Sequence, residues 1–443
     1  MSRTGGSVGN ILRNTGWLLG GKGVSAALSL IYLAIVTRSL GLEGFGQFSL
    51  ALGTAQAVEL LVSFQSWQIV VRYGIPHSHA GRLKELAMLL RFSIWLDVGA
   101  ALVSSAVIAL VMPLLGSYFG WSGEFTAQAT LCGIVFVLAT HWTPIGVLRM
   151  RDRFATAALA DSVTPVTRCL GALAIWVIEP SVIGYLAVWS AAELLTAIAY
   201  WFCALRLDGL SWRLDRPLRW REVRQANPGI GGYAVATNLN SSLDVGGKQV
   251  VVLLVGFLLS PAAVGGFRLA QQLAQALAKL SQAMGRAIFP ELMRSRPDDS
   301  RTQHFEALLK GTARLTAIGG ALVCAVLLLL GRPALGLIAG EEFLWAYPVL
   351  LLLGTSAAID FAAVGFEPAL VALGRPGLAL KLRFVSTSLL FAGVATLTPR
   401  FGTVGAGAAV LAASILSILL LWFSLRRLLA REPISDGGPS AHG

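Results

Sequence analysis

The chain has 443 residues, of which 55% are hydrophobic and only 13% charged, and its formal net charge is +12. Charged residues make up about a quarter of a typical soluble domain, so this composition excludes an ordinary soluble protein. A basic balance of this size can indicate nucleic-acid binding. Here most of the positive charge falls in gaps between long apolar segments, and we therefore expect no nucleic-acid partner.

The apolar segments predict about twelve membrane spans of about 20 residues each. In the first half of the chain we expect them at 14–37, 45–69, 85–112, 126–148, 154–178 and 182–205. A turn at 38–44 is expected to separate the first two spans. Pro113 is expected to end the third span, because proline interrupts the helical hydrogen-bond pattern.

The longest polar stretch, 206–228, divides the chain into two nearly equal halves. Its arginines and tryptophans, together with short apolar pieces, are typical of an amphipathic segment at a membrane surface. Six further spans are expected at 233–259, 263–288, 308–330, 343–373, 378–397 and 404–425. We therefore predict a six-helix lobe at 1–205, a linker at 206–228, a second six-helix lobe at 229–425 and a polar tail at 426–443.

Lys and Arg are sorted between the gaps. Every second gap holds or adjoins 26 of the 35 Lys and Arg residues, whereas the intervening gaps hold only Arg38, Arg332 and Arg400. Loops rich in Lys and Arg stay on the cytoplasmic side of a membrane. With twelve spans, this pattern places both termini in the cytoplasm and the basic loops beside membrane lipids.

The two halves share a short repeated sequence. Gly46-Gln-Phe-Ser-Leu-Ala51 begins the second span, and Gly265-Gly-Phe-Arg-Leu-Ala270 begins the eighth. Parallel repeats related by an axis along the membrane normal build two lobes around a central cavity. The predicted fold is therefore an all-α polytopic membrane protein of about twelve helices in two such lobes.

The eighth span carries polar residues along its length. The residues on one helical face recur at steps of four and three and are Arg268, Gln272, Gln275, Lys279, Gln282 and Arg286. One interpretation is a face lining a hydrated cavity. The other is that Arg268 and Arg286 reach opposite membrane surfaces while the glutamines join helices. Lys279, which lies about eleven residues inside the span, favours the cavity.

Other cations lie within or at the ends of spans. Lys248 stands four residues after Asp244, a spacing that allows an ion pair, so a structural pair and a ligand contact both stay open. For Lys22, two interpretations stay open, a contact with the cavity and a contact between helices. Arg168 lies roughly on the face of Asp161, and we expect it to pair with an acid. Arg38 is expected to anchor the outer surface or pair with Glu43.

Acids at membrane depth could bind a coupling ion, H⁺ or Na⁺, or neutralise the cations above. The sequence does not choose among them, and the candidates are Asp244, Glu59, Asp97, Glu193 and Asp360. The four cysteines and five histidines show no metal-ligand spacing, and no phosphate-binding loop or nucleophile–base arrangement is present. We expect no cofactor, no metal and no catalytic residue.

Several short motifs resemble those of one family: Asn10-Ile-Leu-Arg-Asn14, Thr37-Arg-Ser-Leu-Gly41, Glu43-Gly-Phe-Gly46, Arg149-Met-Arg-Asp-Arg-Phe154, Gly340-Glu-Glu-Phe343, Ala372-Leu-Gly-Arg-Pro376 and Phe401-Gly-Thr-Val-Gly-Ala406. Because these motifs occur in this order along the sequence, the chain resembles bacterial lipid-linked oligosaccharide flippases, which handle O-antigen and exopolysaccharide units. They are the polysaccharide transporters of the multidrug/oligosaccharidyl-lipid/polysaccharide superfamily. The resemblance covers nearly the whole chain.

The resemblance implies transfer of undecaprenyl-diphosphate-linked oligosaccharides across the bacterial inner membrane by alternating access, for surface polysaccharide biosynthesis. It also implies work beside a polysaccharide polymerase and other assembly proteins. Two alternatives stay open: a cation-coupled multidrug antiporter of the same superfamily, and a membrane enzyme such as a glycan polymerase or ligase. Short outer gaps argue against the enzyme, and intramembrane cations favour an anionic cargo over a cationic one.

Overall fold

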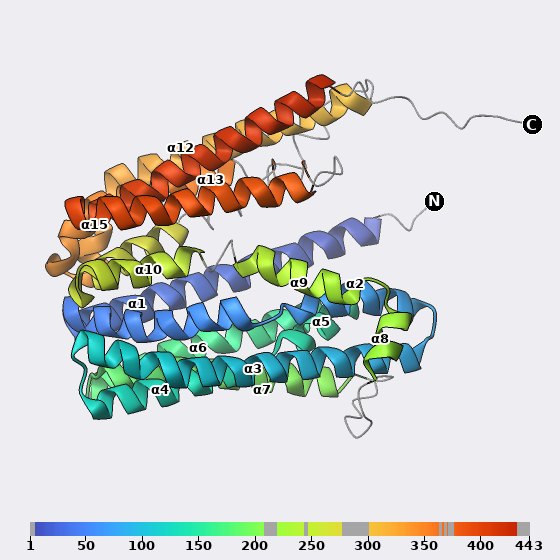
Figure 1. Cartoon of the computed structure of the whole chain (residues 1–443), viewed down its shortest axis with the longest axis horizontal. Helices are drawn as coiled ribbons and strands as arrows, with labels where there is room; N and C mark the ends of the chain where they lie inside the picture. Colours follow the sequence, from blue (N-terminus) through green and yellow to red (C-terminus); the bar gives the residue numbers. More distant parts are fainter. Residues whose placement is uncertain are drawn as a thin grey trace, which may run out of the picture. The chain divides into compact units, whose positions relative to one another are not determined.

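In the computed structural model the described residues are 5–207, 219–242, 247–276, 301–362, 366, 370 and 376–431, and among them helices alternate with short turns and no strand occurs. Side-chain surroundings are described from residue 23 onward, except at 240–241, 248, 301–316, 376 and 429–431 within those ranges. The predicted all-α fold is confirmed (Figure 1). The chain divides into two compact units, Met1–Gly256 and Phe257–Gly443.

Two very long helical segments each contain one glycine break. Helix α1, Gly5–Val62, has Gly41 at φ +64°, and α15, Pro376–Arg431, has Gly402 at φ +61°. A side chain is disfavoured in this left-handed region, so glycine is suited to both positions. A straight helix of 58 residues would be about 87 Å long, far more than the roughly 30 Å membrane interior. Each segment is therefore two spans joined at a glycine.

Eight described helical stretches are long and apolar enough to cross a membrane. Two of them, Gly23–His79 and Gly377–Leu428, contain the glycine breaks, so the eight stretches represent ten crossings. The seventh predicted span corresponds to α9, Ile230–Ser241, and α10, Gly247–Leu258. The eighth is helical over 261–276, where its description ends.

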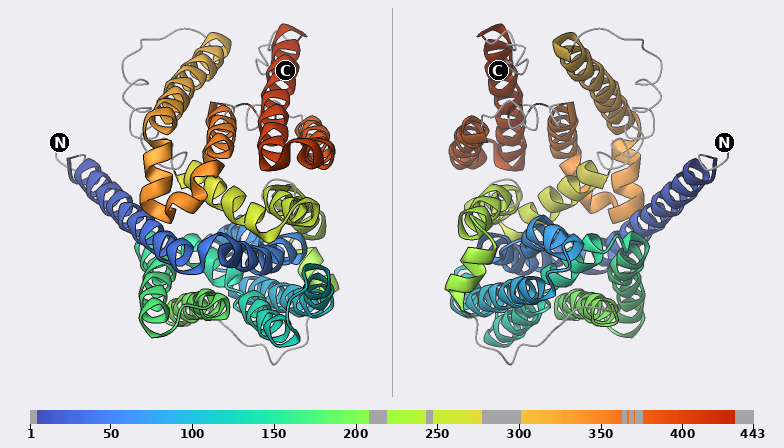
Figure 2. Two further views of the ribbon diagram at one scale, coloured as in Figure 1. Left: turned by 90° about the vertical axis from the view of Figure 1, so that its left-hand side faces the viewer. Right: turned by 90° about the vertical axis from the view of Figure 1, so that its right-hand side faces the viewer.

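The bounds of the other helices of the first unit can be compared with those of the predicted spans. They are α2 Ser66–His79, α3 Leu83–Phe119, α4 Gly123–Leu138, α5 Trp142–Met150, α6 Phe154–Ile178, α7 Val182–Leu205 and the short α8 Trp220–Ala226. The fifth and sixth predicted spans coincide with α6 and α7. Figure 2 shows these helices nearly end-on.

The predicted turn at 38–44 contains the break between the first two spans, which is confined to Gly41 because one left-handed glycine is enough to reverse the chain. The predicted stop at Pro113 is wrong, since α3 continues through it to Phe119 and ends at Gly120 with φ +67°. Proline is tolerated inside membrane helices where neighbouring groups satisfy the freed backbone oxygens.

Two spans that we predicted as continuous are broken in the middle. The second span passes from α1 to α2 through 63–65, and the fourth passes from α4 to α5 through 139–141. The two half-helices α2 and α5 pack directly together. A Cβ atom on Gly146 of α5 would lie 2.8 Å from the Cα atom of Trp67 on α2, so only glycine permits this approach.

Most arginines in the connections of the first unit lie at one end, and Arg38 near the break at Gly41 is an exception. The connections after α2, α5 and α7 lie at the same end of the bundle and carry Arg82, Arg151, Arg153 and Arg206, whereas the turns at 120–122 and 179–181 lie at the other end and carry no Lys or Arg (Figure 1). The bundle therefore has one basic end, as sorting of the loops predicts. That this end faces the cytoplasm stays a prediction.

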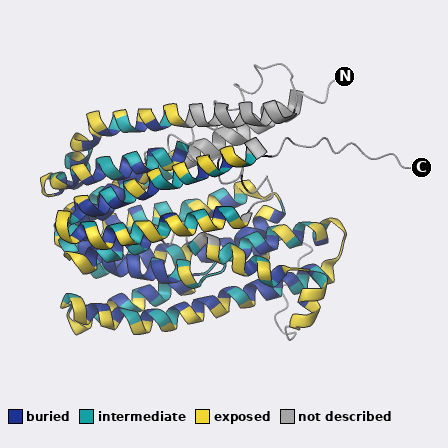
Figure 3. Ribbon diagram, turned by 45° about the horizontal axis from the view of Figure 1, so that its top comes forward, coloured by how far each residue is buried: buried dark blue, intermediate teal, exposed yellow. Residues whose placement is uncertain are grey.

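Large apolar side chains are exposed along the outer helices. Leu110 of α3 and Val177 of α6 are 68% and 75% exposed, and yellow exposed residues run the length of several helices in Figure 3. In water this would be unfavourable, at about 25 cal/mol per Å² of apolar surface. Such surfaces are the ones that lipid would cover.

The second unit contains the helix at 261–276, α12 Arg301–Ala339, the 3₁₀ turn Glu341–Ala346, α13 Tyr347–Ala362 and α15. Helices α12, α13 and α15 pack around small residues. Gly354 of α13 faces Leu327 of α12, and the hydroxyl groups of Ser356 and Ser414 lie 2.8 Å apart between α13 and α15. Close helix packing through small residues is typical of membrane bundles.

The compact units divide after Gly256, whereas the predicted lobes divide at the linker 206–228. The difference arises because α9 packs onto the first unit. Asn238 of α9 and Ser242, directly after it, donate hydrogen bonds to the backbone oxygens of Ser63 and Leu60. The division into two transport lobes stays a prediction.

We predict that Gly146→Ala destabilises the first unit by about 1–3 kcal/mol, because the new methyl group would force α2 and α5 apart. Unfolding of the purified protein in detergent measures the loss. Gly99→Ala is the matched control, since a Cβ there meets nothing within 4 Å. Equal stability of the two variants would show that the close approach is not required.

Candidate functional site

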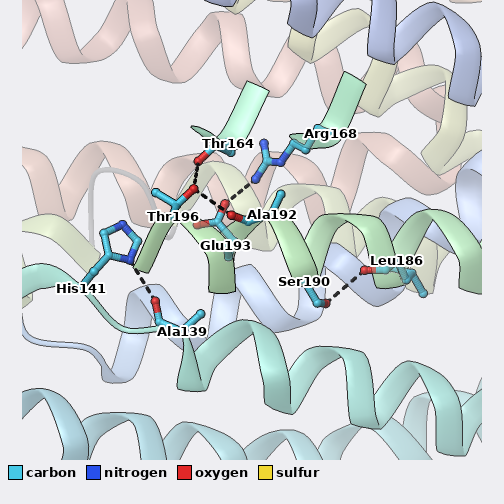
Figure 4. A network of polar contacts seen from close by, with 9 residues as sticks. All are labelled: Ala139, His141, Thr164, Arg168, Leu186, Ser190, Ala192, Glu193 and Thr196. Carbon is cyan, nitrogen blue, oxygen red and sulfur yellow. Dashed lines mark hydrogen bonds and ion pairs between the residues drawn. The ribbon is translucent and has the colours of Figure 1, made fainter. Parts of the chain in front are cut away.

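A charged group lies in the interior of the first unit. Arg168, near the middle of α6, forms an ion pair with Glu193 of α7, and the two side chains are only 19% and 20% exposed (Figure 4). The guanidinium carbon of Arg168 also lies 3.4 Å from the ring centroid of Trp189. Contact with an aromatic face contributes about 2 kcal/mol when the cation is desolvated.

Helical spacing brings these residues together. Trp189 and Glu193 stand four residues apart on α7, so both face α6. Thr164 stands four residues before Arg168, and its hydroxyl group lies 2.7 Å from that of Thr196 (Figure 4). The rings of Tyr32 and Phe48 on α1 pack on Trp189 at centroid distances of 5.6 and 6.0 Å. Three helices therefore fix the guanidinium in place.

The predicted pairing of Arg168 with an acid is confirmed, and the acid is Glu193. Asp161, on whose face Arg168 was placed, instead accepts a hydrogen bond from the hydroxyl group of Tyr200. Spacing along one helix could not identify a partner on the next helix. The Nε atom of Arg168 is buried without a hydrogen-bond partner among the described residues.

A second acid lies close to this pair. Glu59 on α1 interacts electrostatically with Glu193, and it forms no ion pair within the described part of the chain. The group thus combines two carboxylates with one guanidinium. An unbalanced charge is costly at membrane depth.

Asp97 of α3 joins the two broken spans. Its Oδ2 atom accepts hydrogen bonds from the hydroxyl group of Ser66 at 2.9 Å, the hydroxyl group of Thr143 at 2.7 Å and the backbone N–H of Thr143 at 3.0 Å. Ser66 begins α2 and Thr143 lies in the first turn of α5. The carboxylate therefore sits at two helix N-termini, where a negative charge is stabilised.

The backbone oxygens freed by the breaks also have partners. Near the break in the second span, Asn238 Nδ2 donates to the oxygen of Ser63 at 2.7 Å, and Ser242 Oγ donates to that of Leu60 at 3.0 Å. At the break in the fourth span, Trp201 Nε1 donates to the oxygen of Thr140 at 3.1 Å. Sequence analysis found neither break, although asparagine and serine inside an apolar span were a signal for capping groups.

In the second unit, Arg268 is buried and donates from Nη1 to Gln271 Oε1 at 3.1 Å. Gln272 is half-buried and Gln275 is exposed. The predicted polar face therefore passes from a buried to an exposed environment along the helix. Gln271, which sequence analysis did not select, is the residue in contact with Arg268.

The structure places the remaining predicted site residues as follows. Arg38 and Asp360 are exposed. Lys22 lies in α1 and Lys248 in α10, but their side chains are outside the description, and Asp244 and Lys279 lie outside the described residues altogether. The predicted Asp244–Lys248 contact is therefore a continuing prediction. Within the described residues, no group of three His, Cys, Asp or Glu side chains could hold a metal ion.

We predict that Arg168→Met or Glu193→Leu lowers the free energy of unfolding by about 3–5 kcal/mol, because each leaves the other charge buried and unpaired. The double variant should lose less than the sum. Unfolding in detergent provides the measurement.

The exposed pair Arg219–Glu222 is the matched control. Its side chains are 70% and 51% exposed, so its removal should change stability by no more than about 1 kcal/mol. If Arg168→Met cost no more than Arg219→Met, the interior pair would have no structural role.

Comparison with solved structures shows the fold. The chain superimposes on the lipid II flippase MurJ in an inward closed conformation with a TM-score of 0.67 and 13% identity, covering 93% of this chain and 87% of MurJ. It superimposes equally well on an inward-facing multidrug resistance MATE transporter of the MOP superfamily, with a TM-score of 0.67, 13% identity and coverage of 92% and 96%. For the Vibrio cholerae MATE transporter VcmN the TM-score is 0.61, with 15% identity and coverage of 97% and 98%.

Comparison of sequences is more specific. The chain is 27% identical over 358 residues to the inner membrane protein YghQ of Escherichia coli (strain K12), covering 78% of this chain and 97% of that protein. The sequence profile described as "Polysaccharide biosynthesis protein" matches residues 11–296, well over half of the chain. The chain thus has the fold of the MOP superfamily transporters, and it belongs to the polysaccharide biosynthesis protein family.

Proposed function

We propose that this chain moves undecaprenyl-diphosphate-linked oligosaccharides from the inner to the outer leaflet of the bacterial inner membrane, by alternating access between two lobes around a central cavity. The family, the MOP fold and the inner-membrane relative support this role in surface polysaccharide biosynthesis. The observation that carries the choice of an anionic cargo is the presence of arginines, Arg168 and Arg268, buried within membrane-spanning helices.

The physical reason is the charge of the diphosphate. Water and counterions stabilise that charge at the membrane surface, and the protein must replace them during transfer. A guanidinium group suits this task, because its planar set of N–H donors matches phosphate oxygens and its charge is permanent. The Nε atom of Arg168 has no hydrogen-bond partner among the described residues, and the ion pair with Glu193 would hold the guanidinium in position between cargoes.

The proposed cargo contacts extend along the spans of both halves. They are Lys279 and Arg268 first, followed by Lys248, Lys22, Arg168, Arg38, Gln272 and Gln275. The lipid tail of the cargo would stay in the bilayer. The transport cycle would be driven by H⁺ or Na⁺ bound at one of the acids named above, and a polysaccharide polymerase would use the product.

A cation-coupled multidrug antiporter is the second candidate, and one observation favours it. Glu59, near Glu193, adds an acid that the described cations do not pair. An acidic interior attracts cationic compounds. A membrane polymerase or ligase is disfavoured, because in the first unit the turns at the end opposite the basic loops are only about three residues long and leave no room for a large outer loop.

The proposal is tested by reconstitution. Purified protein in vesicles should move a labelled lipid-linked oligosaccharide between leaflets, and an impermeant enzyme or reagent that modifies the exposed glycan measures the movement. Transport of a cationic dye with no movement of the glycan lipid would overturn the proposal and favour the antiporter. Empty vesicles and vesicles with an unrelated membrane protein are the controls.

We predict that Lys279→Gln and Arg268→Gln each slow glycan-lipid transfer about tenfold or more. A hydrogen bond to a charged group contributes about 1.5–3 kcal/mol, and these variants remove one in the membrane interior. Arg332→Gln is the matched control, because Arg332 is an exposed cation predicted in an outer gap. Normal transfer by Lys279→Gln, with normal protein abundance, would exclude Lys279 as a cargo contact.

A further inference from the structure

Asp97 contacts the two broken spans through only one of its two carboxylate oxygens. All three hydrogen bonds go to one carboxylate oxygen, Oδ2. The other oxygen, Oδ1, is buried and has no hydrogen-bond partner among the described residues. Asp97 as a whole is only 3% exposed. A buried carboxylate oxygen without a donor is costly, and such exceptions need an explanation.

A second unpartnered group lies on the same helical face. Ser93 stands four residues before Asp97 on α3, is fully buried, and its Oγ atom also lacks a partner. Residues four apart on a helix are neighbours. The two atoms do not bond to each other, so Oδ1 has no donor from this face of α3 either. A proton on Oδ1 would remove the negative charge from this buried oxygen.

Among the described residues, no charged side chain forms a hydrogen bond or an ion pair with Asp97. Its hydrogen-bond partners there are Ser66 and Thr143, both uncharged. The elements packed against α3 are α1, α2, α4, α5 and α8. The charged and titratable groups with described side chains on these elements and on α3 itself are Tyr32, Arg38, Glu43, Glu59, Arg72, Tyr73, His77, His79, Lys84, Glu85, Arg91, Tyr118, Glu124, Cys132, Arg149, Arg221, Glu222 and Arg224. The ionised carboxylate therefore depends on three neutral donors and two helix N-termini.

We propose that Asp97 is a proton-binding site whose occupancy controls how firmly the half-helices α2 and α5 are held to α3. A proton from water adds to Oδ1, and the carboxylate becomes a neutral carboxylic acid. Hydrogen bonds to an ionised acceptor are roughly twice as strong as those to a neutral one. Protonation therefore weakens the three bonds at Oδ2 and loosens both helix breaks together.

The breaks are suited to such motion. Residues 63–65 and 139–141 are non-helical in the middle of the second and fourth spans, and the half-helices beyond them carry the basic end of the first unit. The half-helices move as one body because Gly146 lets α5 pack against the backbone of Trp67 on α2. This inference concerns the hinge and holds whatever the cargo is.

Infrared difference spectroscopy tests the proton site directly, using the full-length protein in lipid nanodiscs between neutral and acidic pH. The wild-type protein should gain a carboxylic-acid C=O stretching band that Asp97→Asn lacks. Asp161→Asn is the matched control, because Asp161 is an exposed acid on α6 that contacts Tyr200 and not the hinge, and it should keep the band.

Hydrogen exchange of the peptide segment 139–150 tests the hinge. After correction for the intrinsic effect of pH, acidification should speed exchange of this segment in the wild-type protein. In Asp97→Asn, which imitates the protonated acid in shape and charge, exchange should be fast and independent of pH. A band that persists in Asp97→Asn, or exchange at 139–150 that does not respond to pH in the wild-type protein, would overturn the inference. Neither measurement uses the glycan lipid, so both are independent of the transport assay.

Discussion

The structure depends on one constraint, which is that backbone N–H and C=O groups inside a membrane must find partners within the protein. Long helices satisfy it automatically, and this accounts for the uninterrupted α6 and α7. The breaks at 63–65 and 139–141 are tolerated because side chains from other helices supply the missing hydrogen bonds. Each break is therefore a joint construction of at least three helices.

The same constraint explains why the turns at the ends of spans are so short. A left-handed glycine, at Gly41 or Gly402, reverses the chain with almost no exposed backbone. Gly120, directly after α3, and Gly229, directly before α9, also have positive φ values. Short turns of this kind keep polar backbone out of the hydrocarbon region.

Charged side chains inside the first unit make a second set of contacts between the helices. Charges in the interior of the first unit occur in small groups, each with its own partners. Arg168 has Glu193 and the face of Trp189, and Asp97 has three donors at two helix ends. In our proposals, Arg168 would exchange Glu193 for an anionic cargo, and Asp97 would take up a proton. These are properties suited to a transporter, which must bind and release within one cycle.

Much of this protein could be predicted from local sequence. Hydrophobic length predicted the approximate positions of the spans that the structure describes, and sorting of the cations predicted the basic end of the first unit, because both are properties of segments taken one at a time. The sequence also predicted that Arg168 needs an acid. Only the tertiary structure decided that the acid is Glu193 and that Pro113 does not end its helix. It also decided that the second and fourth spans are broken where the half-helices beyond the breaks contact Asp97 of α3. Those outcomes depend on side chains brought together from distant spans, and spacing along one helix carries no information about which neighbour will face it.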